Sequence, residues 1–176
     1  IVSSACRSAK YIIAQVNARM PRTFGQSFIH VDKIHVFYHC DEELPELMPA
    51  VLDEVTLKIG QYVASLISDG CTLQMGIGKI PDAVLQCLDH HKDLGIHTEM
   101  FSDGVIPLLE KGIINNEKKN IHRNKTVTSF CIGSRRLYDF VHNNPHVEFY
   151  PSEYTNSPSV IAQNDNLVAV NSAIEV

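Results

Sequence analysis

Two short segments of this chain hold residues suited to chemistry on an acyl group. Residues 73–81 (LQMGIGKIP) have the pattern of a strand that runs into a glycine loop and then into a helix. Residues 95–100 (GIHTEM) have the pattern of a strand that ends near the carboxylate of Glu99. Backbone N–H groups beside a carboxylate suit covalent acyl transfer, because they can hold the oxyanion that forms when a carbonyl is attacked. The same two features also suit a nucleotide site.

The loop after the first strand holds two glycines, Gly76 and Gly78, on either side of Ile77. Glycine adopts φ/ψ values that are closed to other residues and lets a ligand approach the backbone. The helix that follows points its unpaired N–H groups into the same space, where a phosphate or an oxyanion can bind. A glycine pair is also common in a tight strand-to-helix turn that binds nothing, so the loop alone leaves both interpretations open.

Glu99 stands at the carboxyl end of its strand. In an extended strand His97 and Glu99 share one face, and Ile96 and Thr98 share the other. If this strand and the one before the glycine loop are parallel neighbours, Glu99 and the loop meet at the sheet edge where α/β proteins bind ligands. A glutamate that only faces water is an equally open alternative, and His97 is either an orienting or a purely structural residue.

A dinucleotide-binding fold is the main competing interpretation. It too places an acidic residue about 20 residues after a glycine loop, where that residue holds a ribose hydroxyl. Gly76, Gly78 and Glu99 fit this spacing. Pro81 does not fit, because that fingerprint needs a third glycine where the helix packs on the strand. The apolar helix pattern before Cys71 is also unexpected for a motif that usually opens its domain.

Composition limits the classes of function. The 176 residues are 44% hydrophobic and 20% charged, as in an ordinary soluble globular protein of one or two domains. The net charge of −5 argues against a nucleic-acid partner, because there is no basic excess to contact phosphates. No apolar run reaches the roughly 18 residues of a membrane helix. The five cysteines are scattered without a CxxC pair, which favours reduced thiols in an intracellular protein. No group of His, Cys, Asp or Glu residues has the spacing of zinc ligands, so we expect no metal site.

From residue 50 onward, strand and helix patterns alternate, which predicts an α/β domain with a largely parallel sheet. We expect strands at 11–16, within 28–38, and at 71–75, 94–98, 125–132, 147–150 and 167–174, and helices at 51–67, 81–90, 105–111 and 135–142. Residues 115–125 are predicted to be a polar loop. Its basic patch, which we expect to be solvated unless it meets the phosphates of a nucleotide-like ligand, consists of Lys118, Lys119, Arg123 and Lys125.

Residues 41–49 are acidic and contain two prolines, a composition that predicts a linker at a domain boundary. The chain begins on Ile1 without an initiator methionine or a signal peptide, and it ends in an apolar stretch of strand character at 167–176. Because domains seldom end inside a core strand, we expect this chain to be an internal fragment of a longer protein.

Four segments together resemble one protein family. They are residues 17–23 (NARMPRT), 73–84 (LQMGIGKIPDAV), 95–104 (GIHTEMFSDG) and 170–176 (VNSAIEV). In this order they resemble the acetyl-CoA hydrolase/transferase family and, within it, the 4-hydroxybutyrate CoA-transferase-like branch of the family I CoA-transferases. The resemblance runs through nearly the whole chain.

The resemblance implies a full protein of two related α/β domains with the active site in the cleft between them. Residues 1–45 are then the end of the N-terminal CoA-transferase domain, residues 46–50 a linker, and residues 51–176 the truncated first part of the C-terminal CoA-transferase domain. A homo-oligomer in the cytoplasm or the mitochondrial matrix is expected, without a nucleic-acid or membrane partner.

The resemblance also implies an activity and a site. Glu99 maps onto the catalytic nucleophile, and Gly76, Ile77 and Gly78 map onto the loop that binds the oxyanion and CoA. The implied reaction transfers CoA between an acyl-CoA and a short-chain acid such as 4-hydroxybutyrate or acetate, through a glutamyl-CoA thioester. The CoA thioester is a substrate, and no prosthetic group is expected. An acyl-CoA hydrolase that uses the same glutamate, a dinucleotide-binding oxidoreductase and a non-catalytic scaffold are the alternatives.

Overall fold

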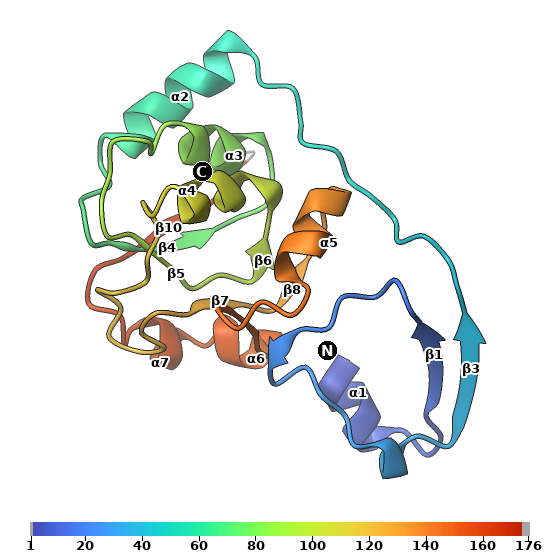
Figure 1. The fold of residues 1–176 in the computed structure, drawn as a ribbon. Helices are drawn as coiled ribbons and strands as arrows, with labels where there is room; N and C mark the ends of the chain where they lie inside the picture. Colours follow the sequence, from blue (N-terminus) through green and yellow to red (C-terminus); the bar gives the residue numbers. More distant parts are fainter. Residues whose placement is uncertain (1, 174–176) are drawn as a thin grey trace.

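Short strands and helices alternate along residues 2–173, the part of the chain that this computed structural model describes (Figure 1). The strands are β1 (Ile13–Asn17), β2 (Phe24–Gly25), β3 (Val36–Cys40), β4 (Thr72–Met75), β5 (Gly95–Ile96), β6 (Met100–Phe101), β7 (Thr126–Thr128), β8 (Phe130–Cys131), β9 (Val147–Phe149) and β10 (Leu167–Val170). The helices are α1 (Val2–Ser8), α2 (Glu54–Ala64), α3 (Lys79–Gln86), α4 (Ile106–Glu110), α5 (Arg135–Val141), α6 (Ser152–Thr155) and α7 (Pro158–Ile161). Two 3₁₀ turns lie between them, η1 (Val31–Lys33) and η2 (Asp103–Val105).

The strand pairs of the described residues are all parallel, which confirms the predicted α/β class. Strand β4 lies between β10 and β5, and β9 lies between β7 and β2. A parallel bridge between His97 and Val127 connects these two three-stranded sheets, and β6 pairs with β8 just beyond it. Because neighbouring strands are parallel, the carboxyl ends of β4, β5, β7 and β9 share one edge of the sheet, the edge at which α/β folds bind ligands.

The core lies between this sheet and the helices on its two faces. In Figure 1, α2, α3 and α4 lie on one side of β4 and β5, and α6 and α7 lie on the other. Leu73, Ile96 and Val127, from three adjacent strands, have no exposed surface. Strand β7 is buried along its whole length although two of its three residues are threonines. Helix α2 approaches α3 closely at Gly60, where an added Cβ would lie 2.8 Å from the backbone of Ala83.

The predicted elements are present, but several are shorter than expected. The helix predicted at 51–67 begins at Glu54, because the Asp53 carboxylate accepts the Thr56 N–H at 2.8 Å and caps the helix there. The strand predicted at 125–132 is broken into β7 and β8. The strand predicted at 94–98 is shortened to β5, which ends at Ile96. The last predicted strand is confirmed as β10, although residue 174 lies outside the described residues. Sequence patterns did not predict α1, α6, α7, β2 or β6.

Apart from β2, which pairs with β9, the elements of residues 2–40 lie beside the main sheet. Strands β1 and β3 pair only with each other, and many of their apolar side chains are exposed, among them Ile13 (65%) and Phe37 (44%). Residues 41–53 contain no helix or strand and run along the outside of the molecule to α2 (Figure 1). This extended stretch includes the predicted linker at 46–50. The division of the chain into domains at this point stays a prediction.

Three further observations hold for residues 2–173. No helix among them combines the length and the apolar character needed to cross a bilayer. Within the same residues, His, Cys, Asp and Glu side chains do not gather in a group of three or more that could hold a metal ion. All five cysteines lie in this part of the chain as free thiols.

Candidate active site

The glycine loop leaves the end of β4 and packs against the end of β10. The Gly76 N–H donates to the Val170 carbonyl at 2.7 Å. A Cβ at Gly76 would lie 2.5 Å from the side-chain oxygen of Asn171, so this close contact requires glycine. Gly78 has φ +128° and is the N-cap residue of α3, a conformation that other residues rarely adopt. The structure thus confirms the predicted strand, glycine loop and helix, and it leaves the Ile77 side chain 63% exposed.

The segment that carries Glu99 is fixed by hydrogen bonds on both sides. On the β4 side, the Thr98 hydroxyl donates to the Met75 carbonyl at 2.8 Å and accepts the Met75 N–H at 3.1 Å. On the other side, the Glu99 carbonyl accepts the Ser129 N–H at 2.8 Å and the Phe130 N–H at 3.1 Å. The Thr128 hydroxyl donates to the same carbonyl at 2.9 Å. Two successive N–H groups on one carbonyl make a bulge, which is why the predicted strand at 125–132 is broken.

These contacts bring the backbone at Glu99 close in space to the start of the glycine loop. Strands β4 and β5 are parallel neighbours, as the argument from the sequence required, with Leu73 opposite Ile96. Met75 directly precedes Gly76, and Thr98 directly precedes Glu99. The Thr98–Met75 hydrogen bonds therefore join the residue before the predicted loop to the residue before the predicted nucleophile. The catalytic and binding roles of these residues stay predictions.

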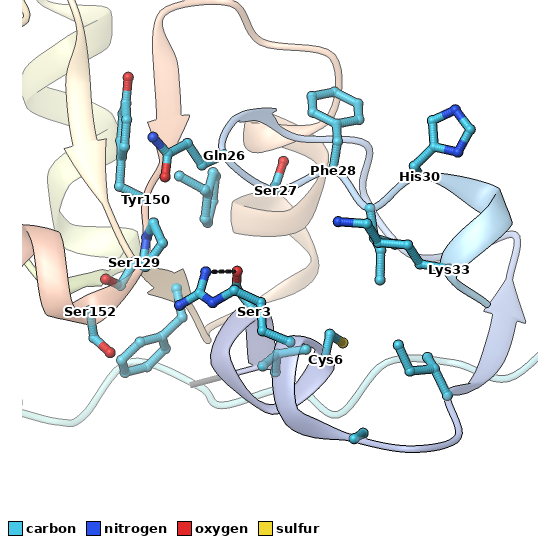
Figure 2. Close-up of a pocket in the computed structure, with 18 of the residues that line it drawn as sticks. Ser3, Cys6, Gln26, Ser27, Phe28, His30, Lys33, Ser129, Tyr150 and Ser152 are labelled. Atoms are coloured by element: carbon cyan, nitrogen blue, oxygen red, sulfur yellow. Dashed lines mark hydrogen bonds between the residues drawn. The ribbon is translucent and has the colours of Figure 1, made fainter. Parts of the chain in front are cut away.

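Glu99 lines a cavity of about 930 Å³ between the main sheet and the N-terminal elements. Figure 2 shows Ser129, Tyr150 and Ser152 on one side of this cavity and Phe28, His30 and Lys33 on the other. Ser129 and Tyr150 directly follow β7 and β9, Ser152 begins α6, and the last three precede or belong to η1. The volume suffices for a small-molecule ligand. Gly76, Ile77 and Gly78 are not among the residues that line this cavity.

His97 is fully buried below Glu99. Its Nε2 lies 3.2 Å from the Thr155 carbonyl, which fixes the proton on Nε2, and its Nδ1 has no partner in the described residues. Burial and the nearby Lys119 ammonium lower the pKa of His97 to about 4. The ring is therefore neutral at pH 7. It makes no hydrogen bond to the Glu99 carboxylate, so an orienting effect of His97 has to act through the backbone.

An aromatic cluster connects this buried histidine with the cavity wall. The His122 ring contacts Tyr154 through a 2.6 Å hydrogen bond, and the Tyr150 hydroxyl donates to Glu148 at 3.0 Å. Tyr150 stacks on Tyr154 with ring centroids 5.0 Å apart. Burial, followed by the hydrogen bond to Glu148, raises the pKa of Tyr150 to about 12. Tyr150 thus lines the cavity as a neutral residue whose hydroxyl is held by Glu148.

The prediction of a solvated basic patch in residues 115–125 was wrong for Lys119. Its side chain is only 2% exposed, and its ammonium group donates to two backbone carbonyls rather than facing water. The Lys125 ammonium group also donates to a carbonyl, that of Pro145, at 2.7 Å. Only Lys118 and Arg123 have exposed side chains in this patch. The positive charge of a lysine does not indicate whether its side chain packs across a glycine of a neighbouring strand, as the side chain of Lys119 does.

Sequence reasoning also missed Thr98, Thr128 and Ser129 as residues that hold the Glu99 segment. A threonine directly before the strand-end glutamate was visible in the sequence, but its side chain was expected only on the opposite face from Glu99. The contribution of Ser129 and Thr128 depends on the bulge in the neighbouring strand, which has no local sequence signal.

Comparisons with known proteins bear on this arrangement. Residues 133–176 match the family model of the acetyl-CoA hydrolase/transferase C-terminal domain. Over 98% of its length the chain is 54% identical to the 4-hydroxybutyrate coenzyme A transferase of Clostridium kluyveri, of which it covers 40%. Over its whole length it is 46% identical to the succinyl-CoA:acetate/propanoyl-CoA:succinate CoA transferase of Fasciola hepatica, of which it covers 37%. The chain thus spans about two fifths of the length of these curated relatives.

Solved structures agree with the sequence comparisons. The crystal structure of 4-hydroxybutyrate CoA-transferase from Porphyromonas gingivalis superposes with a TM-score of 0.95 and 50% identity, over 99% of this chain and 44% of that one. The crystal structure of RipA from Yersinia pestis gives a TM-score of 0.94 and 33% identity, over 99% of this chain and 40% of that one.

The fold, the sheet edge and the relatives agree: this chain is a parallel α/β structure similar to part of the CoA transferases. The resemblance to the acetyl-CoA hydrolase/transferase family is confirmed, and within this family the chain is similar to the 4-hydroxybutyrate CoA-transferases.

Proposed function

We propose that the full-length protein carrying this sequence transfers CoA between an acyl-CoA and a short-chain carboxylic acid such as 4-hydroxybutyrate or acetate. The observation that supports this most directly is the position of Glu99, which lines a ligand-sized cavity at the carboxyl edge of a parallel sheet. Its neighbour Thr98 donates a hydrogen bond to Met75, the residue before the glycine loop. The relatives named as CoA transferases support the same chemistry.

In the proposed mechanism Glu99 is the nucleophile. A Glu99 carboxylate oxygen attacks the thioester carbon of the acyl-CoA, the carbon–sulfur bond breaks, and CoA leaves as a thiolate. The product is a mixed anhydride between the acyl group and Glu99. The thiolate then attacks the glutamyl carbonyl carbon and releases the first acid, which leaves a glutamyl-CoA thioester. A second carboxylate takes the CoA by the reverse sequence, so that one hard exchange is divided into easier steps.

The glycine loop supplies the electrostatic part of the proposal. An attacked carbonyl becomes an oxyanion, and backbone N–H groups already aimed at it lower the barrier. We assign this role to the amide of Ile77, between Gly76 and Gly78, at the N-terminus of α3. Loss of one such donor costs about 3 kcal/mol of transition-state stabilisation in other enzymes. A cleft closed to water would also raise the reactivity of a carboxylate, which is a weak nucleophile when hydrated.

A hydrolase is the second candidate, because the matching family model covers acetyl-CoA hydrolases as well as transferases. It would use the same glutamate but transfer the acyl group to water. The two activities differ in their need for an acceptor acid: free CoA released at the same rate with and without acetate supports the hydrolase, and turnover that requires acetate supports the transferase.

The direct test is the change Glu99→Ala in the full-length protein. We expect exchange of CoA between an acyl-CoA and acetate to fall below detection while the circular dichroism spectrum stays that of the unchanged protein. Glu117→Ala, which removes an exposed glutamate of the loop at 115–125, is the matched control and should keep full activity. Retained exchange in the Glu99→Ala protein would exclude Glu99 as the nucleophile.

A second measurement detects the covalent intermediate. Incubation with an acyl-CoA and no acceptor, followed by peptide mass analysis, should show CoA attached to Glu99. An unmodified Glu99 peptide from a preparation with confirmed turnover would contradict the proposed reaction sequence. The proposal treats the CoA thioester as a substrate and assigns no prosthetic group. A homo-oligomeric state and a cytoplasmic or mitochondrial location stay predictions.

A further inference from the structure

The hydrogen-bond ladder between β5 and β7 is interrupted three residues before Glu99. The Thr98 N–H donates to the Val127 carbonyl at 3.0 Å, as in a regular parallel pair. Two residues earlier, the same pattern would pair the Ile96 N–H with the Lys125 carbonyl. Instead, the Ile96 N–H donates to the Asn116 side-chain oxygen at 2.9 Å, and the Lys125 carbonyl accepts from the Lys119 ammonium at 2.6 Å. Two side chains of the 115–125 loop thus stand between the strands.

The two side chains hold both backbone groups of Ile96. Lys119 also donates to the Ile96 carbonyl at 2.8 Å, while Asn116 accepts the Ile96 N–H. Asn116 in turn donates to the Thr126 hydroxyl at 3.1 Å, which links it to β7. The hydrocarbon part of Lys119 lies on Gly95, where a Cβ would come within 2.6 Å of its Cγ. We call Asn116 and Lys119, with these contacts, the Ile96 clamp.

A buried ammonium group in this position needs an explanation. Lys119 is 2% exposed, and it forms no ion pair with a carboxylate within the described residues. Removing a cation from water is costly unless its donors are satisfied. Burial lowers the pKa of Lys119 to about 7, and Glu148 partly opposes this shift. The other titratable groups that act on this region are His97 and His122. The hydrogen bonds to the Ile96 and Lys125 carbonyls offset part of this cost, so the burial of the lysine is tied to the backbone path at this point.

We infer that Lys119, assisted by Asn116, is a positioning residue for the Glu99 carboxylate: the Ile96 clamp sets the backbone path of residues 96–99. The inference rests on the proposed function, since it concerns the position of the proposed nucleophile. The segment between the clamp and Glu99 is held at one end by Lys119 and Asn116 and at the other by Ser129 and Phe130. Fixed at both ends, it has little freedom to move the carboxylate away from an attacked carbon. A displacement of about 1 Å at a reacting group costs roughly 100-fold in rate.

The test is the change Lys119→Met in the full-length protein, which keeps the hydrocarbon chain on Gly95 and removes the ammonium group. We expect the rate of glutamyl-CoA formation on Glu99 to fall about 100-fold, with the KM for acyl-CoA changed less than about threefold. Lys119→Gln, which keeps N–H donors without the charge, should retain an intermediate rate and serves as a second variant if Lys119→Met does not fold. Lys111→Met, at an exposed lysine paired with Asp89, is the matched control and should keep the full rate.

Two further measurements separate positioning from a general loss of stability. Val141→Ala removes two methyl groups from a core residue of α5 that is 1% exposed, and it should lower the melting temperature without lowering the rate of adduct formation at 25 °C. Hydrogen exchange should show faster exchange of the amides of residues 96–99 in Lys119→Met and unchanged exchange in β10.

The outcomes are distinguishable. An unchanged protein that forms no glutamyl-CoA adduct would overturn the proposed function. An adduct rate in folded Lys119→Met equal to that of the unchanged protein would overturn the inference alone. Equal rate losses in Val141→Ala and Lys119→Met would overturn it as well, because the effect would then follow stability.

Discussion

The Thr98 hydroxyl makes two hydrogen bonds to the backbone of Met75, one as donor to the carbonyl at 2.8 Å and one as acceptor from the N–H at 3.1 Å. The regular pairing of β4 with β5 ends two residues before Met75 and Thr98, at Leu73 and Ile96. A side chain thus replaces the next ladder bonds, and the two strands separate where the glycine loop and Glu99 begin. Such a separation at the carboxyl edge of a parallel sheet is where α/β proteins bind ligands.

Thr98→Val is the first test of this arrangement. Valine has the shape of threonine but leaves the buried Met75 N–H and carbonyl without these partners. Each buried polar group without a partner costs about 1–3 kcal/mol. We expect the free energy of unfolding in urea to fall by about 2–6 kcal/mol and CoA exchange to fall with it. Thr98→Ser keeps the hydroxyl and should retain most of both quantities, so equal losses in the two variants would contradict the assigned role of these hydrogen bonds.

Gly76→Ala tests the contact between the glycine loop and β10. The new Cβ would meet the Asn171 side-chain oxygen at 2.5 Å and the Val170 carbonyl oxygen at 3.1 Å, so the loop has to move away from β10. We expect kcat for CoA exchange to fall at least tenfold with a folded protein. Asn171→Ala removes the nearer of the two contacts, so adding it to Gly76→Ala should restore part of the activity. Full activity in Gly76→Ala alone would show that the loop position is not critical.

The sequence predicted the parts of the site that depend on local pattern. Alternation of strands and helices predicted the parallel sheet, and the glycine loop and Glu99 were correctly placed at its carboxyl edge. These predictions depend on short-range periodicity and on the handed geometry of parallel sheets. The boundaries of β5 and β7 were less accurate, because they are set by where neighbouring strands stop pairing.

The contacts that hold the site could not be predicted, because they join residues far apart in the chain. Lys119 belongs to a polar loop with three other basic residues, and nothing in its neighbours distinguishes it from a solvated lysine. Only the path of the loop across Gly95 buries it. Likewise, the side chain of Thr98 finds Met75, 23 residues away, because β4 and β5 are neighbours in the sheet.

The contact between Asp103 and the start of α5 provides a further test. Its carboxylate accepts the Ser134 N–H at 2.9 Å and the Ser134 hydroxyl, and so caps the start of α5 from the turn that follows β6. We expect Asp103→Ala to lower the free energy of unfolding by about 1–2 kcal/mol, measured in urea. Asp103→Asn keeps an acceptor for the N–H and should lose less. An Asp103→Ala protein as stable as the unchanged one would show that this cap contributes nothing.

The stability of the fold should depend on pH through His97. Burial and the Lys119 ammonium lower the pKa of His97 in the folded protein to about 4, from 6.5 for an unperturbed histidine. Between these pH values the unfolded chain binds a proton that the folded protein does not. The free energy of unfolding therefore falls on acidification from pH 6.5 to 4, by about 3 kcal/mol from this residue. His122, whose pKa is also lowered, chiefly by burial, contributes in the same direction.

Urea unfolding of the unchanged protein and of His97→Gln across this pH range isolates the effect. Glutamine can still donate to the Thr155 carbonyl but does not titrate, so the difference between the two curves should shrink steadily as the pH falls from 6.5 to 4. Other groups titrate in both proteins and cancel in the difference. His90→Gln makes the same substitution at an exposed histidine of the turn after α3 and is the control. Its pH dependence of unfolding shows the effect of the substitution at a residue that is not buried. A difference between the unchanged protein and His97→Gln that stays constant over the range would mean that the folded protein protonates His97 as readily as the unfolded chain does.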